Sequence, residues 1–313
     1  MTYKKRLVFL LVLIGILALT YTGGIIFGHD LRRERVQMFA WLDSTDAGRI
    51  TRIVVSNEWE DFELTKRYDQ WYVLHNGSVF PARQLRVEDF ISILATRAAW
   101  PVRAASVAAH ERFGLDEHAS RVTVFAGNSV LLDILVGGDD PIRRETYIRK
   151  AGQNEVRSGE RGIRGYVSGN ITSWYNLRLI PETEGGFVGS DSVQRLLIYT
   201  DGYMQIFTRS NREWDIYGLF IEDPDFSRIE NYVNIVLNTE GEDFDETVSS
   251  ADPMFNHSRI TLEFGLGHQV NIRLNEGDED GRRLAHVEGR EYIYSISPWA
   301  SNRLFRSAAD FER

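Results

Sequence analysis

Hydrophobic and polar residues alternate with a period of two through two long parts of this chain. In each part the alternation forms three short runs separated by polar turns, and the third run opens with a tryptophan, Trp71 or Trp214. A period of two places one face of a strand against a core, so these runs predict half-buried antiparallel strands. The runs are residues 50–55, 62–66 and 70–74 in the first part, and 193–198, 204–208 and 213–217 in the second.

A helical pattern follows the three predicted strands in both parts. Residues 87–94 and 229–236 carry apolar side chains at i, i+3, i+4 and i+7, which indicates an amphipathic helix. More alternating runs follow each helix, and each part closes on a Trp-x-x-x-Arg-Leu sequence that starts at Trp174 or Trp299. The later runs are residues 120–124, 131–136 and 146–149, then 258–262, 270–274 and 292–296.

The shared order of these features predicts an internal duplication. We expect an α+β fold in which an N-terminal transmembrane helix precedes two tandem, duplicated units of mostly antiparallel sheet, each with one main amphipathic helix. Repetition at equivalent positions favours a packing role for Trp71, Trp174, Trp214 and Trp299. The expected domains are a membrane anchor at 1–30, a stalk at 31–47, a first repeat at 48–182, a linker at 183–190 and a second repeat at 191–313.

The transmembrane prediction depends on residues 7–27, from Leu7 to Phe27, which contain no charged side chain. As a helix this stretch is about 31 Å long, enough to cross the hydrocarbon core of a bilayer. Lys4, Lys5 and Arg6 precede it, so we expect the N-terminus in the cytoplasm and the body outside. A cleaved signal peptide is the alternative, but the run is longer than a usual signal core and no Ala-x-Ala-like site closes it.

Composition narrows the classes of function. The 313 residues are 43% hydrophobic and 12% aromatic, enough to bury a core, so a globally disordered chain is excluded. The chain has no cysteine, which excludes disulfides, thiolate metal sites and cysteine nucleophiles. Its net charge of -9 argues against a nucleic-acid partner, because phosphate contacts need a clustered basic surface.

Several short motifs mark the first repeat. They are Leu-Thr-Lys at 64–66 ahead of Trp71, Phe-Gly-Leu-Asp at 113–116, Ser-x-Val-x-Val at 120–124, Gly-Gly at 137–138 and Thr-Tyr-Ile-Arg at 146–149. Together they resemble the bacterial domain of unknown function DUF4340. The resemblance covers most of residues 48–182 and extends more weakly to the second repeat, where no Gly-Leu-Asp turn precedes Ser258.

The resemblance to DUF4340 implies where the protein acts and beside which proteins, but it implies no particular reaction. Members of that family are membrane-anchored and are often encoded beside components of gliding-motility-type ABC transporters. No catalytic residues are established for the family, so none is carried over to this chain. We therefore expect no catalytic, cofactor-binding or metal-binding residues and no cofactor.

The densest group of chemically active side chains spans residues 110–118, from His110 to His118. Two histidines and three carboxylates could gather around a divalent ion if Gly114 folds the segment back. However, the histidine spacing matches no metal motif. The structural alternative is a helix that ends at Phe113, with Gly114 as its C-terminal stop and Asp116 capping the next turn.

Three other polar segments are better explained as turns. Residues 240–246 and 276–281 are acidic loops, but neither has the ligand spacing of a calcium loop. Residues 137–140 pair two glycines with two aspartates, and adjacent carboxylates disfavour a phosphate site. A serine hydrolase is not supported either, because the chain has no Gly-x-Ser-x-Gly sequence.

We therefore expect a single-pass binding or scaffolding protein of the inner (cytoplasmic) membrane, with its body outside the cytoplasm and no catalysis of its own. The expected role is an accessory subunit of an ABC-transporter-type envelope complex. Its partners would be the lipid bilayer, through residues 7–27, and membrane proteins such as a permease or ATPase. The alternatives are an envelope hydrolase or metal-dependent enzyme that uses residues His110 to His118, and a passive spacer.

Overall fold

The structure is a computed structural model. It describes residues 14–17, 21, 38–140, 142, 145–159, 162–180, 189–200, 202–210, 213–218 and 221–313. Within these residues no helix is both long and apolar enough to cross a bilayer. The predicted transmembrane segment, residues 7–27, lies outside them except for residues 14–17 and 21, and the predicted linker, residues 183–190, lies outside them except for its final two residues.

The predicted fold class, an α+β fold that begins with a transmembrane helix, is wrong. Antiparallel sheet dominates the described residues, in three sheets of two, nine and eight strands, and helices are few and short. The reason lies in the sequence: the period-two alternation extends over most of the body, whereas the helical pattern covers only two short stretches. The α-helices are α2 (Ser44–Ala47), α3 (Gln84–Ala95), α4 (Gly162–Val167), α5 (Phe226–Leu237) and α6 (Pro298–Leu304).

Contacts divide the described residues into two compact units. Unit 1 takes the described residues within 1–63 and 88–169, and unit 2 takes those within 64–87 and 170–313. The domain boundaries predicted from the sequence repeat are based on repeated sequence patterns rather than on contacts, and they stay a prediction. In unit 1, the segment expected as a stalk contributes β1 (Met38–Phe39), which pairs with β6 (Ala98–Ala99). Trp41 and Leu42 of the same segment are buried.

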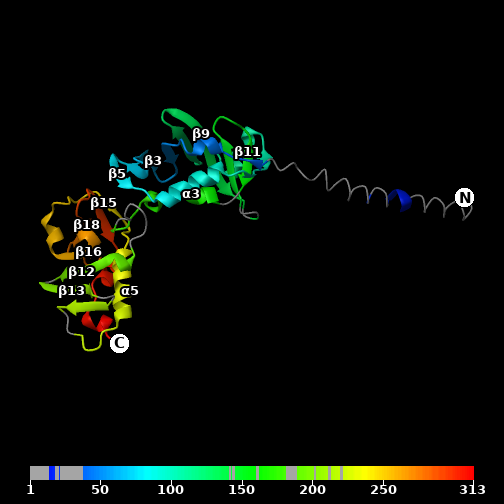
Figure 1. Ribbon diagram of the computed structural model, residues 1–313. Coiled ribbons are helices and arrows are strands. Elements are labelled where there is room, and N and C mark those ends of the chain that lie inside the picture. The colour runs from blue at the N-terminus through cyan, green and yellow to red at the C-terminus, as the bar shows by residue number, and fades with distance from the viewer. Residues whose placement is uncertain are drawn as a thin grey trace, which may run out of the picture. The chain divides into compact units, whose positions relative to one another are not determined.

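The nine-stranded sheet has the order β5-β4-β3-β2-β8-β9-β10-β11-β7. Helix α3 lies across one face of this sheet in Figure 1 and buries Val87, Phe90 and Leu94. The strands are β2 (Arg52–Ser56), β3 (Asp61–Arg67), β4 (Gln70–His75), β5 (Ser78–Pro81), β7 (Val102–Ala104), β8 (Ser120–Ala126), β9 (Ser129–Asp139), β10 (Thr146–Lys150) and β11 (Val156–Gly159).

The eight-stranded sheet has the order β14-β13-β12-β16-β17-β18-β19-β15. Helix α5 lies alongside it in Figure 1 and buries Tyr232, Val233 and Val236. The strands are β12 (Val193–Thr200), β13 (Tyr203–Ser210), β14 (Glu213–Tyr217), β15 (Asp243–Asp245), β16 (Ser258–Phe264), β17 (Gln269–Leu274), β18 (Arg283–Val287) and β19 (Ile293–Ile296).

The two large sheets have corresponding strand orders. Strands β2, β3 and β4 occupy the places of β12, β13 and β14, and β8 to β11 occupy those of β16 to β19. Strand β7 stands last in the first sheet, as β15 does in the second, and a twelve-residue helix follows the opening strands in both. Within the described strands of these two sheets, β5 alone lacks a counterpart.

The predicted packing role holds for three tryptophans and is wrong for the fourth. Trp71, Trp174 and Trp214 are buried, whereas Trp299 is 67% exposed. The cause is the local backbone. Trp174 ends a 3-10 helix and is followed by extended backbone at Tyr175, whereas Trp299 lies in the first turn of α6, on its solvent-facing side.

Residues 308–313 are built into unit 2. The backbone N–H of Asp225 donates to Phe311, and that of Arg313 donates to Asp223. The Phe311 ring is 1% exposed and lies 5.2 Å from the ring of Tyr232 and 5.3 Å from that of Phe207. This short segment therefore completes the core beneath α5.

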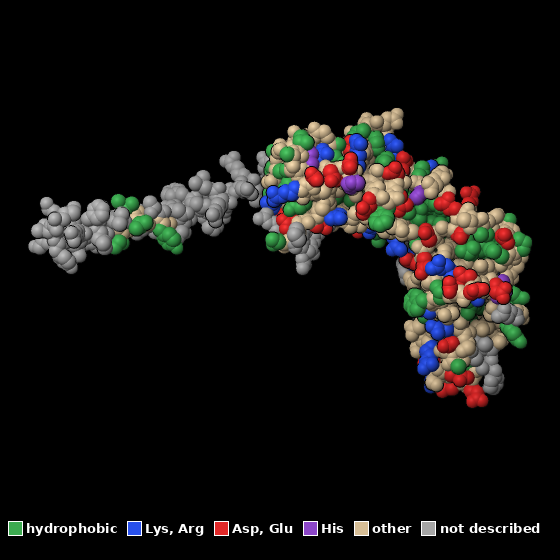
Figure 2. Space-filling view, turned by 180° about the vertical axis from the view of Figure 1, so that it is seen from behind, with side chains coloured by type: hydrophobic (Ala, Val, Ile, Leu, Met, Phe, Trp, Pro, Cys, Tyr) green, Lys and Arg blue, Asp and Glu red, His purple; other side chains and the backbone are tan. Residues whose placement is uncertain are grey.

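Charged side chains of both signs are mixed on the surface. On the face shown in Figure 2, Lys and Arg alternate with Asp and Glu over both units, and the described part of this face has no extended basic patch. Some of this mixing is explained by cross-strand pairs, such as Arg195 with Glu263 at 3.0 Å and Arg121 with Asp133 at 2.7 Å.

Candidate functional site

The segment from His110 to His118 forms a structural turn. Its short helix Glu111–Phe113 ends at Gly114, which has a left-handed backbone with φ 64°. The Asp116 carboxylate accepts a hydrogen bond from the backbone N–H of His118. These are the predicted roles of Gly114 and Asp116, and both are confirmed.

The two histidines of this segment have different surroundings. His110 is buried, and its Nε2 lies 3.2 Å from the carbonyl oxygen of Asn154. The His118 side chain is 78% exposed and lies 3.8 Å from the carboxylate of Glu117. Nowhere in the part of the chain that the structure describes do three His, Asp or Glu side chains gather as metal ligands would. The structure therefore does not assemble this segment into a metal centre.

The turn at 113–116 packs directly on the glycine pair of β9. A Cβ atom on Gly137 would lie 2.8 Å from the carbonyl oxygen of Gly114 and 2.9 Å from Cγ of Leu115, and closer still to the carbonyl oxygen of Phe113. Only glycine permits this approach, because a Cβ atom at such distances overlaps its neighbours. The Phe-Gly-Leu-Asp and Gly-Gly motifs are therefore the two sides of one close contact.

The Thr-Tyr-Ile-Arg motif of β10 completes this cluster. The Tyr147 ring lies 4.4 Å from the Phe113 ring, and an Arg149 guanidinium nitrogen lies 3.4 Å from the carbonyl oxygen of Leu115. The Tyr147 hydroxyl donates to Asp140 at 3.0 Å; burial raises the pKa of Tyr147, and this hydrogen bond raises it further. Three motifs that are separated in sequence thus stabilise one another, which explains them as packing.

The two acidic loops do not form ligand cages. Asp278 accepts from the backbone N–H groups of Asp280 and Arg282, as a turn residue does. In the other loop, Glu240 pairs with Arg83 at 2.7 Å and Glu246 accepts from Ser78 at 3.0 Å. These carboxylates are engaged by different partners, so the segment does not gather them around one point.

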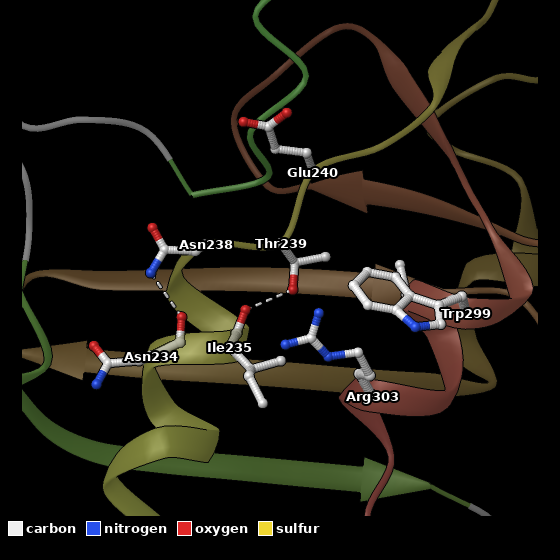
Figure 3. Close-up of a pocket in the computed structure, with 8 residues that line it drawn as sticks. Asn234, Ile235, Asn238, Thr239, Glu240, Trp299 and Arg303 are labelled. Carbon is white, nitrogen blue, oxygen red and sulfur yellow. Dashed lines mark hydrogen bonds between the residues drawn. The ribbon is translucent and has the colours of Figure 1, made fainter.

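A surface hollow of about 470 Å³ lies in unit 2 between the end of α5 and α6 (Figure 3). The sequence did not reveal it, because its walls come from helices more than sixty residues apart. The lining side chains are those of Asn234, Ile235, Asn238, Thr239, Glu240, Trp299, Ala300 and Arg303.

The hollow is flanked on one side by a tryptophan and an arginine. Trp299 and Arg303 are four residues apart on α6, so they share one helical face. The Arg303 guanidinium carbon lies 4.2 Å from the centre of the Trp299 ring, a cation–π contact. In the view of Figure 3 the guanidinium lies on the side of Trp299 that faces α5. No acidic side chain among the described residues forms an ion pair with Arg303.

The opposite wall is the capped end of α5. The Asn238 amide donates to the carbonyl oxygen of Asn234 at 2.8 Å, and the Thr239 hydroxyl donates to that of Ile235 at 2.8 Å (Figure 3). Asn238 also accepts from Arg178 at 3.0 Å. These bonds satisfy carbonyl groups that a helix end otherwise leaves open, so this wall is held in one arrangement.

These features define the protein as a two-unit antiparallel-sheet protein with an open, aromatic-flanked hollow in its second unit. Residues 71–158 match the family model of a domain of unknown function, DUF4340. That segment belongs to the DUF4340 family, as its motifs predict. No curated protein and no solved structure matches the chain.

Proposed function

We propose that this protein is a binding or scaffolding protein, without catalysis of its own, whose ligand or partner occupies the hollow of unit 2. The exposure of Trp299 carries the proposal. A tryptophan that is 67% exposed leaves a large apolar surface in water, although the matching tryptophan of the first repeat, Trp174, is fully buried. Tryptophan and arginine are also the residues that most often dominate binding surfaces.

The setting of this binding protein is an ABC-transporter-type envelope complex, in which it acts as an accessory subunit. This part of the proposal is supported by the resemblance to DUF4340. We propose further that the body lies outside the cytoplasm at the inner membrane, a proposal that the uncharged sequence of residues 7–27 supports. The hydrolase alternative gains no support from the surroundings of His110 and His118, and we do not propose it.

The test is native co-purification. We expect the tagged, full-length protein, extracted in mild detergent, to bring down an ABC permease or ATPase. A lone monodisperse species would contradict the accessory role. Replacing residues 31–313 with an unrelated domain should abolish the co-purification, since the proposal assigns the contact to the body.

A pair of matched variants tests the hollow itself. Trp299→Ala should weaken binding of the partner or ligand, whereas Trp59→Ala should leave it unchanged. Trp59 is a suitable control because it is 70% exposed and lies in unit 1. Equal binding by both variants would show that the hollow is not the site.

A further inference from the structure

The eight-stranded sheet ends on strand β14, which pairs with β13 along one edge only. Its other edge, the outer edge, has no strand partner among the described residues. Such an edge presents a row of backbone N–H and C=O groups to which another strand can bind, and proteins often protect it with a proline, a bulge or lysine side chains. Strand β14 has five residues, no proline and an unbroken register with β13, and its two charged side chains are acidic. The outer edge is therefore open to strand addition.

The first repeat shows what this edge lacks. Trp71 of β4 and Trp214 of β14 open equivalent runs, so Val73 and Ile216 hold the same place two residues further on. In the first sheet β5 covers the edge of β4, where Phe80 lies directly opposite Val73, and Val73 is 0% exposed. Ile216 has no described strand opposite it at the outer edge and is only partly buried. An apolar side chain in the place of Phe80 would complete its burial.

The side of β14 that faces away from the core defines the charge of the missing strand. Glu213, Asp215 and Tyr217 point to this side and are exposed, Tyr217 by 57%. Neither carboxylate forms an ion pair with a residue in the described part of the chain. Side chains directly opposite each other on paired strands interact, so unlike charges attract there and like charges repel. The outer edge therefore favours a strand with basic side chains opposite the two carboxylates.

The same carboxylates disfavour a second copy of this chain as the occupant. In the antiparallel register that pairs all five residues of β14 with those of another β14, the two Asp215 side chains lie directly opposite each other. Glu213 lies opposite Tyr217 in that register and also gains no cation. A basic segment of another protein meets neither problem.

We infer that the outer edge of β14 binds an extended, basic segment of a partner protein, which adds a ninth strand to this sheet. Backbone hydrogen bonds supply affinity in this mode of binding, and alternate side chains supply specificity. Along an antiparallel segment the expected order is apolar, large apolar, basic, small and basic, opposite Tyr217, Ile216, Asp215, Trp214 and Glu213. The inference goes beyond the proposed function, because β14 contributes no residue to the hollow and the two surfaces can be tested separately.

The probe is the peptide Thr-Val-Phe-Lys-Thr-Lys-amide with an N-terminal fluorophore, and the acidic probe replaces both lysines with glutamate. Fluorescence anisotropy with the full-length protein should give a dissociation constant on the order of millimolar or tighter for the basic peptide. The acidic peptide should not bind. Hydrogen exchange should show slower exchange of the β14 amides when the basic peptide is bound, which separates strand addition from general attraction to a chain of net charge -9.

Variants locate the site. Asp215→Lys should weaken binding of the basic peptide about tenfold or more and allow the acidic peptide to bind, because attraction and repulsion are exchanged. Glu279→Lys is the matched control: it makes the same charge change at an exposed residue of unit 2 and should alter neither affinity. Trp299→Ala should also leave both affinities unchanged. Because Asp215 is exposed, its substitution should preserve the unfolding midpoint.

A change in the peptide tests the backbone bonds without altering the protein. N-methylation of alternate residues removes the N–H donors along one edge of the peptide and keeps its charges. Of the two alternate sets, one should abolish binding and the other should not.

The strand-addition inference is overturned if the basic peptide leaves exchange of the β14 amides unchanged, if both methylated peptides bind as well as the unmodified one, or if Asp215→Lys binds the basic peptide fully. It is also overturned if β14 becomes protected with rising protein concentration in the absence of peptide, since a second copy would then occupy the edge. If the peptide binds at β14 but no transporter component co-purifies, the accessory role fails and the strand-addition inference stands.

Discussion

The close contact between β9 and the 113–116 turn gives the sharpest test of how the DUF4340 motifs act. The perturbation is Gly137→Ala, which adds one Cβ atom at a residue with ordinary backbone geometry. That atom would lie 2.8 Å from the carbonyl oxygen of Gly114 and 2.9 Å from Cγ of Leu115. Two of its three close neighbours are backbone atoms, so a side-chain rotation cannot relieve the overlap.

The expected loss of unfolding free energy depends on how far the 113–116 turn must move to make room for the added Cβ atom. The turn is held by the ring contact of Phe113 with Tyr147 and by the burial of Leu115, which is 0% exposed. Forcing an extra methyl group into a packed site costs about 1–3 kcal/mol. Lifting the turn also exposes part of Leu115, whose full burial contributes about 1.5–3 kcal/mol. We expect Gly137→Ala to lower the free energy of unfolding by about 2–4 kcal/mol.

The assay is urea unfolding of the full-length protein, combined with amide hydrogen exchange that resolves β9 and residues 113–116. Gly165→Ala is the matched control, because its Cβ would meet nothing within 4 Å and it lies in α4. That control should stabilise by up to about 1 kcal/mol through helix propensity. Equal stability of Gly137→Ala and the wild type, with unchanged exchange in the turn, would refute the packing explanation of the motifs.

Three further predictions concern single contacts. Gly159→Ala should destabilise by about 1–3 kcal/mol in urea unfolding, because its Cβ would lie 2.7 Å from Cδ2 of the buried Trp100; a neutral result would contradict the close approach. Burial raises the pKa of Glu230, but hydrogen bonds from Ser190, Trp214 and Arg209 outweigh burial and leave that pKa below its ordinary value. Its stabilisation is therefore present above the unfolded pKa of about 4.3 and lost as pH falls through the folded pKa. Glu230→Gln should cost about 2 kcal/mol at pH 7 and flatten the acid side of the stability profile, and an unchanged profile would contradict this. Tyr232→Phe should cost about 1 kcal/mol in thermal unfolding, since the buried hydroxyl donates to the carbonyl oxygen of Leu304 at 2.6 Å; no change would mean that the bond contributes nothing.

Strand positions could be predicted from the sequence because the alternation is local. The run at 50–55 overlaps β2, and the run at 213–217 coincides with β14. Strand β5 was missed because its four residues, with Pro81 at the end, are too short for a periodic signal. The pairing of β1 with β6 was also missed, because two-residue strands are set by tertiary contacts alone.

The candidate site could be predicted less well than the strands. The repeated Trp-x-x-x-Arg-Leu sequence indicated burial for both of its tryptophans. In the first repeat the backbone is extended at Tyr175, and Arg86 lies over the ring of the buried Trp174. In the second, helix α6 places Arg303 over Trp299 at the surface. The same sequence motif therefore has a buried tryptophan in the first repeat and an exposed tryptophan in the second. The motif does not specify the local backbone conformation, and that conformation decides where the tryptophan side chain lies.

The placement of Phe311 beneath α5 has a consequence for how the chain matures on the ribosome. Tyr232 is synthesised several seconds before Phe311, at a rate of about 5–20 residues per second. During that interval the apolar side of α5 lacks the ring that later covers it, so it is open to chaperones and to proteases. The strands of unit 1, in contrast, are complete once residue 159 has emerged. A premature stop after residue 169 and before residue 311 should therefore leave unit 2 as a degradation target while unit 1 keeps all of its own strands.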